Sequence, residues 1–226
     1  MAKRIFVTAT NTDIGKTYTS LQLIKALSQQ GYRVGIYKPI ETGVTSYPMD
    51  GKALFETALH YNPSLKELDL GDIVTMTFPL PASPFVASGG EAIDLARFEK
   101  AIEKIERFCD IVIIEGAGGL MVPVDAATMM IDLPRYFGAV TLLVTHCRLG
   151  CINDTLLSLQ ALESRKLPHR WVLNCRGEES GFEQTSLPYF QHRFGTIYRL
   201  QDDIHALAQA LLDTIPSAIE ERPCDI

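Results

Sequence analysis

The stretch ATNTDIGKT, at residues 9–17, is the feature that most restricts how this chain can fold. It follows the short apolar run of residues 5–7, and apolar residues recur after it at helical spacing, from position 21 to position 27. The order is therefore a strand, a loop that ends in Gly15-Lys16-Thr17, and a helix, which is the context that a Walker A phosphate-binding loop requires. We interpret the stretch as such a loop, against the alternative of a chance Gly-Lys-Thr at a helix start.

Each residue type in this loop has a chemical reason to be there. Backbone N–H groups of the loop and of the helix start form a concavity that binds anions, and Gly15 lets the chain turn where a Cβ atom would crowd the phosphates. Lys16 would bring a positive charge to the β- and γ-phosphates, and Thr17 would offer its hydroxyl to Mg²⁺. Ala9 stands at the first position, where the pattern usually has glycine, and we expect its methyl group to be tolerated because the position ends the strand.

Strand-like and helix-like segments alternate along the rest of the chain. Strands are predicted over residues 4–9, 33–39, 110–116, 139–146 and 170–174, and Pro39 is expected to end the second. Helices are predicted up to Gly31, over part of residues 52–61, over residues 94–108 with Asp94 as the N-cap, and over residues 129–137, 151–166 and 202–212. Weaker helix and strand signals fill residues 179–200, and residues 78–90 are interpreted as a structured loop.

The alternation itself predicts the fold class. Residues 110–116 and 139–146 are continuously apolar, as central strands of a parallel sheet are when helices cover both faces. We therefore expect an α/β protein with a doubly wound, mostly parallel sheet of the P-loop NTPase type. The expected organisation is a single domain over residues 1–226, with residues from about 215 to 226 as a frayed tail.

Charge and cysteine content limit the classes of function. The 226 residues carry a net charge of −6, so no general basic field exists to bind nucleic acid. Cys147 and Cys151 lie four apart beside His146, but the paired spacing of a zinc site is absent, and we interpret all five cysteines as reduced thiols of a cytosolic protein. The first apolar run is too short for a signal peptide, and no stretch has the length of a membrane span, so we expect a cytoplasmic protein without a membrane partner.

Polar residues follow the predicted strands, at the strand ends where ligands collect in open α/β sheets. Lys38 ends the second strand, and we interpret it as a site lysine rather than a surface lysine, able to hold an acidic substrate and to stabilise charge during phosphoryl transfer. Glu115 follows four apolar residues, and Gly116 and Gly118 after it allow the backbone to approach a ligand closely. This carboxylate is a candidate Mg²⁺ ligand, against the alternative of an incidental glutamate in a turn.

The stretch RLGCINDT, at residues 148–155, begins a helix after the strand at residues 139–146. Free N–H groups near Cys151, Ile152 and Asn153 would bind a carboxylate without a basic side chain. Alternatively, Asn153 or Asp154 simply caps the helix. The residues themselves leave both interpretations open.

Taken together, these segments resemble the dethiobiotin synthetase family. The resemblance is carried by FVTATNTDIGKT, GYRVGIYKPIETG, PASPFVAS, VIIEGAGGLMVP and RLGCINDTLLS, which follow one another in the family's order up to about residue 160. EGAGG and LGCIN, together with the phosphate-binding loop, are specific, whereas the residues beyond Trp171 match weakly. The resemblance implies an ATP-dependent ligase of biotin biosynthesis.

The implied reaction joins CO₂ to a diamine and uses ATP. CO₂ adds to one amine of 7,8-diaminopelargonate to give a carbamate, ATP phosphorylates the carbamate, and the second amine attacks to close a cyclic urea, with release of ADP and phosphate. The resemblance also implies Mg²⁺ as a cofactor, CO₂ or bicarbonate and a nucleoside triphosphate as co-substrates, and a homodimer whose substrate site is shared across the interface.

The resemblance also implies roles for the residues that match the family's motifs. Lys16, Lys38 and Thr12 match catalytic positions, and the two lysines would converge on one spot to neutralise the carbamate and the transferring phosphoryl group. The nucleotide-binding positions are Asp13, Ile14, Gly15, Lys16, Thr17, Tyr18, Asp50, Glu115, Gly116, Ala117, Gly118, Asn174 and Cys175. The substrate-binding positions are Lys38, Thr42, Gly118, Leu149, Gly150, Cys151, Ile152 and Asn153. The metal ligands are Thr17, Asp50 and Glu115.

Two of these assignments carry more detail. Asn174 matches an asparagine that reads the nucleotide base, and the helix start at Gly150 would receive the substrate carboxylate from the neighbouring subunit. Besides Ala9, which stands where the pattern has glycine, the chain departs from the family at three places. At the first, a gapless match puts Lys52 where the metal-binding aspartate stands, so we take Asp50 with a small shift. Cys175 stands where aspartate is common, and Tyr198 where a Gly-x-x-Pro turn has proline, so the sequence does not predict the base.

Three other functions share parts of this pattern. A dimeric P-loop switch ATPase of the partitioning or nitrogenase-iron-protein kind usually has a second lysine early in the loop, where this chain has Thr10 and Asn11. A ligand-sensing relative without catalysis is disfavoured because Lys16, Lys38 and Glu115 are all present. An amidotransferase for corrin acids needs a glutaminase region, for which 226 residues leave no room.

Overall fold

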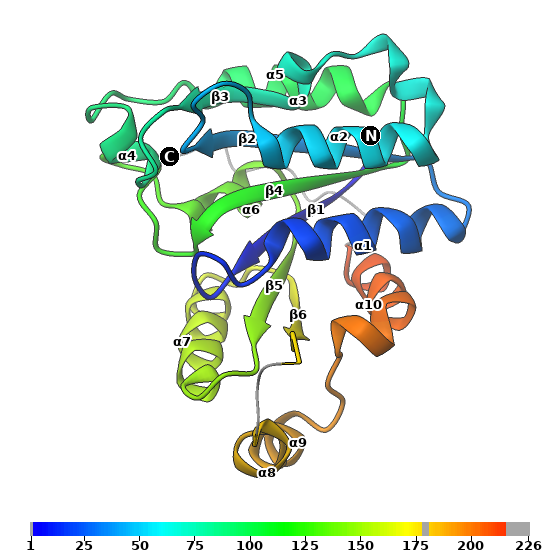
Figure 1. Cartoon of the computed structure of the whole chain (residues 1–226), viewed down its shortest axis with the longest axis vertical. Coiled ribbons are helices and arrows are strands. Elements are labelled where there is room, and N and C mark those ends of the chain that lie inside the picture. The colour runs from blue at the N-terminus through cyan, green and yellow to red at the C-terminus, as the bar shows by residue number, and fades with distance from the viewer. Residues whose placement is uncertain (1, 178–180, 216–226) are drawn as a thin grey trace.

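The computed structural model describes residues 2–177 and 181–215 of the 226-residue chain, and they form one six-stranded sheet between two layers of helices (Figure 1). The strands are β1 (Lys3–Ala9), β2 (Val34–Thr42), β3 (Val74–Phe78), β4 (Ile111–Gly119), β5 (Val140–His146) and β6 (His169–Asn174). Their order in the sheet is β3-β2-β4-β1-β5-β6, and every pair is parallel. The predicted doubly wound α/β fold is therefore confirmed.

Helices connect successive strands and cover both faces of the sheet. They are α1 (Lys16–Gln29), α2 (Met49–Tyr61), η1 (Pro63–Glu67), α3 (Leu70–Ile73), α4 (Pro84–Ala87), α5 (Leu95–Glu106), η2 (Met130–Asp132), α6 (Leu133–Tyr136), α7 (Cys151–Ser164), α8 (Phe182–Thr185), α9 (Leu187–Phe194) and α10 (Leu200–Thr214). Figure 1 shows α1, α2 and α10 on the face toward the viewer, and α5, α6 and α7 belong to the opposite layer. Because parallel strands need crossover connections, the helices between them bury the sheet on both sides.

The core explains why the apolar runs become central strands. All residues of β5 are buried, as are six of the seven residues of β1, so both strands have apolar neighbours on each face. On the face of α5, the rings of Phe6, Tyr37, Phe98 and Phe137 pack against one another with centroids 6.4 to 6.5 Å apart. Asp94 caps α5 as predicted, because its Oδ1 accepts a hydrogen bond from Ala96 N at 3.0 Å.

The prediction that Pro39 ends the second strand is wrong, because β2 continues to Thr42. The first half of β2 pairs with β4 as far as Tyr37, and from Lys38 onward β2 pairs with β3 instead. Pro39 therefore lies where the ladder with β4 has ended, so its missing N–H breaks no hydrogen bond between strands. The strand β3 itself was not predicted, because it is a short edge strand whose residues are mostly half-buried.

The interpretation of all cysteines as reduced thiols is also wrong, because Cys147 and Cys175 form a disulfide. Cys147 directly follows β5 and Cys175 directly follows β6, and the pairing of these two strands brings the two residues together. Cys109 and Cys151 are free and buried. Residues 178–180 and 216–226, and with them Cys224 and nearly all of the expected frayed tail, lie outside the described residues.

Other expectations agree with the structure or are sharpened by it. The short helix expected over residues 129–137 is present as η2 and α6. In the segment with weak signals, the described residues form α8 and α9 and no named strand, although Arg199 makes a single parallel bridge to Leu173. Among residues 2–177 and 181–215, no helix is both long enough and apolar enough to cross a membrane.

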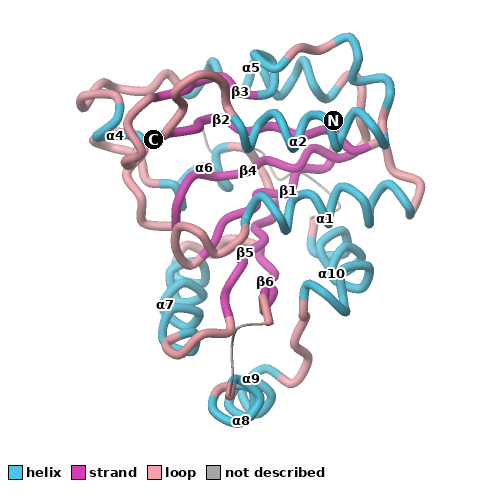
Figure 2. The backbone as a smooth tube through the Cα atoms, viewed as in Figure 1, coloured by secondary structure: helices cyan, strands magenta, loops and turns pink. Residues whose placement is uncertain are grey.

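The loops that follow β1, β2 and β4 gather at one edge of the sheet, on the left side of Figure 2. This is the edge formed by the carboxyl ends of the strands, where ligands bind in open α/β folds. The predicted phosphate-binding loop, the end of β2 and the glycines after Glu115 all belong to this edge.

Candidate functional site

A cavity of about 700 Å³ opens at the carboxyl edge of the sheet. It brings together most of the predicted site residues: Thr12, Asp13, Gly15, Lys16, Thr17, Tyr18, Lys38, Thr42, Asp50, Gly116, Ala117 and Gly118. The remaining lining residues were not predicted: Ile40, Glu41, Pro81, Ala82, Ser83, Pro84, Val122 and Arg176. Segments from six parts of the chain therefore meet in this cavity.

The phosphate-binding loop has the backbone geometry that its sequence predicts. Asp13 and Gly15 have positive φ angles of 59° and 100°, and Gly15 directly precedes α1. A Cβ atom on Gly15 would lie 2.3 Å from Asn174 Nδ2 and 2.9 Å from a guanidinium nitrogen of Arg176. Glycine is thus required here by conformation and by space. Since α1 starts at this point, its first N–H groups face the cavity side of the loop.

Ala9 is accommodated as expected. It is fully buried in β1, it pairs with Gly119 of β4 and Val144 of β5, and it is not among the residues with positive φ. The position that requires a small residue is Gly119, which pairs with Ala9, because a Cβ atom on Gly119 would lie 3.2 Å from Thr10 O and 3.3 Å from Ala9 O.

Glu115 lies beneath the loop as a fully buried carboxylate with three donors. Its Oε1 accepts hydrogen bonds from Thr17 Oγ1 at 2.9 Å and from Lys38 Nζ at 2.7 Å, and its Oε2 accepts one from Ser20 Oγ at 2.7 Å. A buried carboxylate is tolerated only with such compensation. Because the Thr17 hydroxyl donates to Glu115, the lone pairs of its oxygen remain available for a ligand in the cavity.

The two site lysines line the same cavity and have opposite pKa shifts. Burial lowers the pKa of Lys16 from its ordinary value of 10.5, and the positive charge of Lys38 lowers it further. Burial also disfavours the charged form of Lys38, but the attraction and hydrogen bond of Glu115 prevail and raise its pKa. Lys38 is therefore charged and already paired with Glu115. Lys16 is the lysine whose charged form an anionic ligand would stabilise most.

Asp50 lies at the mouth of the cavity. Its Oδ2 is 3.9 Å from Lys38 Nζ, and its side chain is 51% exposed. Thr17 and Asp50 thus place a hydroxyl and a carboxylate oxygen on the cavity wall, which is a donor set that suits Mg²⁺. Glu115 lies behind Thr17 and binds its hydroxyl. No group of three or more His, Cys, Asp or Glu side chains in the described ranges could hold a metal by itself.

Glu41 lines the cavity and was not predicted from the sequence. It lies next to Thr42 at the end of β2, and its carboxylate accepts hydrogen bonds from Asp50 N at 3.1 Å and from Gly51 N at 2.8 Å. It therefore fixes the start of α2, and with it Asp50, at the cavity mouth. Burial raises the pKa of Glu41, while the two backbone N–H groups oppose this shift.

The segment at residues 81–84 forms a wall that was recognised only as part of a motif. Pro81, Ala82, Ser83 and Pro84 line the cavity between β3 and α4. Ser83 caps α4 by accepting a hydrogen bond from Val86 N. The PASPFVAS motif contained this signal, but nothing in its local pattern indicated which residues face the site.

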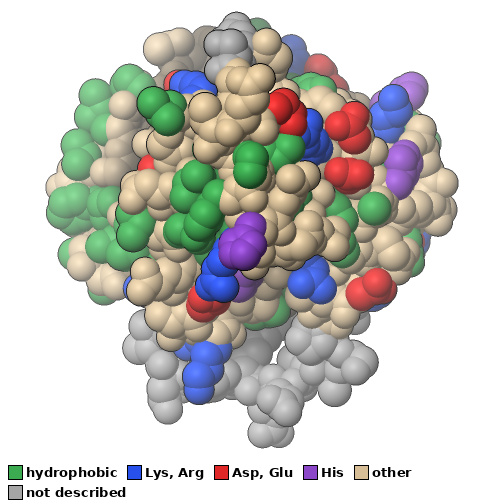
Figure 3. All heavy atoms as spheres, turned by 90° about the horizontal axis from the view of Figure 1, so that it is seen from below, with side chains coloured by type: hydrophobic (Ala, Val, Ile, Leu, Met, Phe, Trp, Pro, Cys, Tyr) green, Lys and Arg blue, Asp and Glu red, His purple; other side chains and the backbone are tan. Residues whose placement is uncertain are grey.

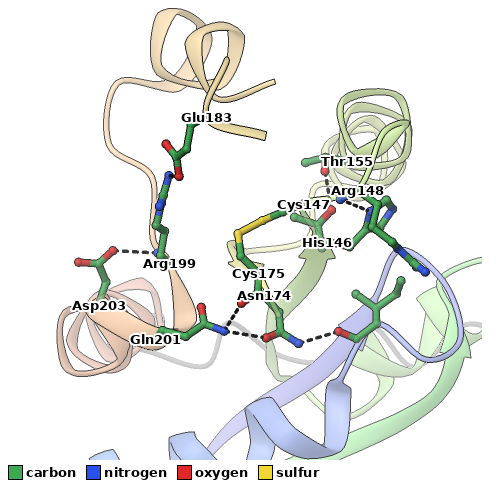
Figure 4. Close-up of a disulfide and its surroundings, with 12 residues drawn as sticks. His146, Cys147, Arg148, Thr155, Asn174, Cys175, Glu183, Arg199, Gln201 and Asp203 are labelled. Carbon is green, nitrogen blue, oxygen red and sulfur yellow. Dashed lines mark hydrogen bonds and ion pairs between the residues drawn. A yellow bond between two sulfur atoms is a disulfide. The ribbon is translucent and has the colours of Figure 1, made fainter. Parts of the chain in front are cut away.

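The end of β6 lies against the outer side of the loop, as Figure 4 shows for Asn174. Asn174 is buried; its Nδ2 donates to Ile14 O at 2.8 Å, and its Oδ1 accepts from Gln201 Nε2 at 3.2 Å. Asn174 and Cys175 do not line the cavity, whereas Arg176 does. The side-chain amide of Asn174, which is predicted to bind the nucleotide base, is hydrogen-bonded here to Ile14 and Gln201.

The predicted carboxylate-binding helix start lies away from this cavity. Leu149, which precedes it, is 93% exposed, and Gly150 has a φ of 98° at the N-terminus of α7. Asn153 Nδ2 donates to Asp154 Oδ1 at 3.2 Å, and Asp154 Oδ2 contacts His146 Nε2 at 3.1 Å. Residues 149–153 therefore do not join the other site residues within one chain.

Comparisons with known proteins agree on what this chain resembles. The AAA domain family matches residues 3–206. The ATP-dependent dethiobiotin synthetase BioD of Sulfurovum sp. (strain NBC37-1) is 41% identical, and the alignment covers 92% of this chain and 99% of the relative. The enzyme with the same name from Wolinella succinogenes is 38% identical over 94% of this chain and 100% of the relative.

Solved structures extend the likeness of fold. The MinD cell division protein of Aquifex aeolicus superposes with a TM-score of 0.52 at 15% identity, covering 95% of each chain. A plasmid partition protein of Borrelia burgdorferi has a TM-score of 0.55 at 11% identity, covering 94% of this chain and 96% of its own. At such low identity these neighbours share the fold with this chain and indicate nothing further.

Proposed function

This chain belongs to the ATP-dependent dethiobiotin synthetase family and is an ATP-dependent ligase of biotin biosynthesis, and from that premise we propose that the cavity at the carboxyl edge of its sheet is the active site. The proposed substrates are 7,8-diaminopelargonate, CO₂ or bicarbonate, and a nucleoside triphosphate. The observation that supports this most strongly is that the phosphate-loop lysine, Lys16, and the strand lysine, Lys38, line one cavity. Had they faced separate cavities, the carbamate and the γ-phosphate would have no common site.

The proposed division of work follows from charge. Lys16 and the loop N–H groups bind the triphosphate, and Lys38 holds the carbamate that CO₂ forms with one amine. The carbamate oxygen then attacks the γ-phosphorus and ADP leaves. The second amine attacks the carbamoyl carbon, phosphate leaves, and the cyclic urea closes. Two ammonium groups directed at the developing charge stabilise both transition states.

Lys38 is suited to this role because Glu115 raises the pKa of its ammonium group. Glu115 keeps it protonated, and its position 2.7 Å from that carboxylate leaves it at the cavity wall rather than free to reach into solvent. Thr12 and Thr42 line the cavity nearby and are proposed to donate hydrogen bonds to the phosphoryl group and the carbamate.

We further propose that Thr17 and Asp50 hold Mg²⁺, with Glu115 orienting the Thr17 hydroxyl from behind. When bound, Mg²⁺ would neutralise charge on the β- and γ-phosphates. Glu41 supports this arrangement because it fixes the backbone N–H groups of Asp50 and Gly51.

A homodimer would complete the site. The segment around Gly150 is remote from the cavity of its own chain, and Leu149 is almost fully exposed. Other exposed apolar side chains are Leu80, Val86, Met121 and Leu157. Figure 3 shows hydrophobic side chains gathered along the left side of the molecule. Such a patch is typical of an interface, and we propose that the partner's Gly150 region receives the substrate carboxylate there.

A phosphate-release assay tests the proposed reaction. Release should require both the diamine and bicarbonate, and Lys38→Ala should abolish turnover while nucleotide still binds. Lys25→Ala, an exposed lysine of α1, is the matched control and should behave as wild type. Hydrolysis indifferent to the diamine would favour a P-loop switch ATPase instead, and near-normal turnover of Lys38→Ala would refute the carbamate role.

Subunit mixing tests the shared site. Lys38→Ala and Gly150→Val should each be inactive, but equal amounts reassembled together should recover about a quarter of wild-type activity, because half of the dimers are mixed and each has one intact site. No recovery would place both groups in one chain. The proposal includes a cytoplasmic location, since ATP is the co-substrate, and cell fractionation tests it.

A further inference from the structure

The segment Asn174-Cys175-Arg176 lies beside the phosphate loop and donates hydrogen bonds to it, and Arg176 also lines the cavity. Asn174 Nδ2 donates to Ile14 O at 2.8 Å, and a terminal guanidinium nitrogen of Arg176 donates to Asp13 O at 2.9 Å. These contacts join residues that are 160 and 163 positions apart. Two consecutive peptide groups of the loop are therefore held by side chains from the end of β6.

Peptide geometry gives these contacts a consequence for anion binding. In a trans peptide the N–H points opposite to the C=O of the same plane. When the carbonyls of Asp13 and Ile14 are held toward β6, the N–H groups of Ile14 and Gly15 point the other way, toward the ligand side of the loop. A cation that donates a hydrogen bond to the Asp13 carbonyl also polarises that peptide and makes the N–H of Ile14 a stronger donor.

Arg176 adds charge as well as geometry. Among the lining residues that the structure describes, the cations are Lys16, Lys38 and Arg176. Lys38 is already paired with Glu115 at 2.7 Å. Arg176 lies beside the loop itself, 2.9 Å from where a Cβ atom of Gly15 would be. Its positive charge therefore contributes to the field at the phosphate end of the cavity.

Two attachments keep this segment in place, and Figure 4 shows both. Gln201 of α10 donates from Nε2 to Cys175 O at 2.7 Å and to Asn174 Oδ1 at 3.2 Å. On the other side, the disulfide joins Cys175 to Cys147 at the end of β5. Cys175, the residue immediately before Arg176, is thus fixed covalently and by one hydrogen bond.

We propose that Arg176 is a positioning residue for the nucleotide, acting through the Asp13 carbonyl, and that the Cys147–Cys175 disulfide keeps Arg176 in place. This inference rests on the proposed function, because it takes the ligand of the loop to be a nucleoside triphosphate. It concerns the phosphates, which all nucleotides share, so it predicts an effect independent of the base.

Steady-state kinetics of two substitutions test the role of Arg176. Arg176→Gln should raise the KM for ATP, GTP and CTP by about tenfold each, since a hydrogen bond from a charged group is lost. The kcat and the KM for the diamine should not change. Arg176→Lys should restore most of the affinity, because an ammonium group still donates to Asp13 O. Arg170→Gln, an exposed arginine on β6, is the control and should match wild type.

Other outcomes would overturn the assignment. An unchanged nucleotide KM in Arg176→Gln would show that the contact does not position the loop. A joint fall in kcat and melting temperature, without rescue by Arg176→Lys, would mean that Arg176 only supports the fold. Equilibrium titration with ATP in the absence of diamine gives the same comparison independently of turnover. If the wild-type protein made no dethiobiotin, this titration would still decide the role of Arg176.

Reduction tests the role of the disulfide. A dithiol such as dithiothreitol converts the Cys147–Cys175 bond to two thiols and is itself oxidised to a cyclic disulfide. The nucleotide KM of wild type should rise, and it should not rise further in Arg176→Gln. The Cys147→Ala/Cys175→Ala protein should match reduced wild type and ignore the reductant, which excludes effects at Cys109 and Cys151. If reduction raised the nucleotide KM equally in wild type and in Arg176→Gln, or did not raise it in wild type, the proposed role of the disulfide would be overturned.

Discussion

Gly15→Ala is the substitution for which the structure gives the most specific expectation. Gly15 has a φ of 100°, and an added Cβ atom would lie 2.3 Å from Asn174 Nδ2 and 2.9 Å from Arg176. The left-handed backbone costs about 1–2 kcal/mol for a residue with a Cβ atom. Asn174 and Arg176 must also move, and losing their two hydrogen bonds to the loop costs about 1–3 kcal/mol in total. Alanine also lowers the conformational entropy of the unfolded chain, and this effect offsets only about 0.4–1 kcal/mol of the destabilisation.

Gly31→Ala is the matched control for this substitution. Gly31 follows α1 at its other end with a similar φ of 91°, but nothing lies within 4 Å of a Cβ atom there. It shares the backbone strain and the change in the unfolded state with Gly15→Ala, so the difference between the two variants isolates the steric displacement. We expect Gly15→Ala to be less stable than Gly31→Ala by about 1–3 kcal/mol, the value of the two displaced hydrogen bonds.

Urea unfolding provides the measurement. The single tryptophan, Trp171, lies in β6 and packs against Phe190 and Phe194, so its fluorescence reports on this part of the fold. ATP titration of the folded variants should show weakened binding for Gly15→Ala and normal binding for Gly31→Ala. If the two unfolding free energies agreed within about 0.5 kcal/mol, which is the usual effect of a surface substitution, or if Gly15→Ala bound ATP normally, the displacement argument would be refuted.

Three further expectations concern charge. Glu115→Gln should lower the rate of phosphate release at least about tenfold, because it removes the charge that raises the pKa of buried Lys38, and the change is read from the steady-state assay. Only the protonated ammonium of Lys16 pairs with phosphates, and burial lowers its pKa below 10.5. ATP affinity should therefore fall as pH rises through that lowered pKa, which titration at increasing pH would measure. Asp125 accepts hydrogen bonds from Ile93, Ala127 and Thr128, so Asp125→Ala should lose about 1–3 kcal/mol of stability in urea with kcat unchanged. Those backbone hydrogen bonds prevail over burial and lower the pKa of Asp125, so its contribution should persist down to the ordinary value of 3.8 and disappear as pH falls through the lower, folded-state pKa.

Local sequence determined the parts of this protein that depend on neighbours along the chain. Periodic apolar residues specify five of the six strands and the long helices, Asp94 specifies a cap, and the Gly15-Lys16-Thr17 sequence specifies the loop. It also indicated that Lys16, Lys38 and Glu115 belong together, because residues at the carboxyl ends of parallel strands meet at one edge. The same local reasoning predicts that Ala9 is tolerated, and its strand geometry agrees.

Tertiary structure alone decided the features that depend on distant residues. Glu41 was recognisable as a support for Asp50 only after α2 had been placed on β2, and Pro39 is tolerated only because β2 changes its partner at Lys38. Whether Cys147 and Cys175 pair depends on β5 lying beside β6, and Arg176 reaches Asp13 only because β6 ends near the loop. A linear pattern carries no record of such contacts, since each is set by how the whole sheet packs and not by the residues on either side.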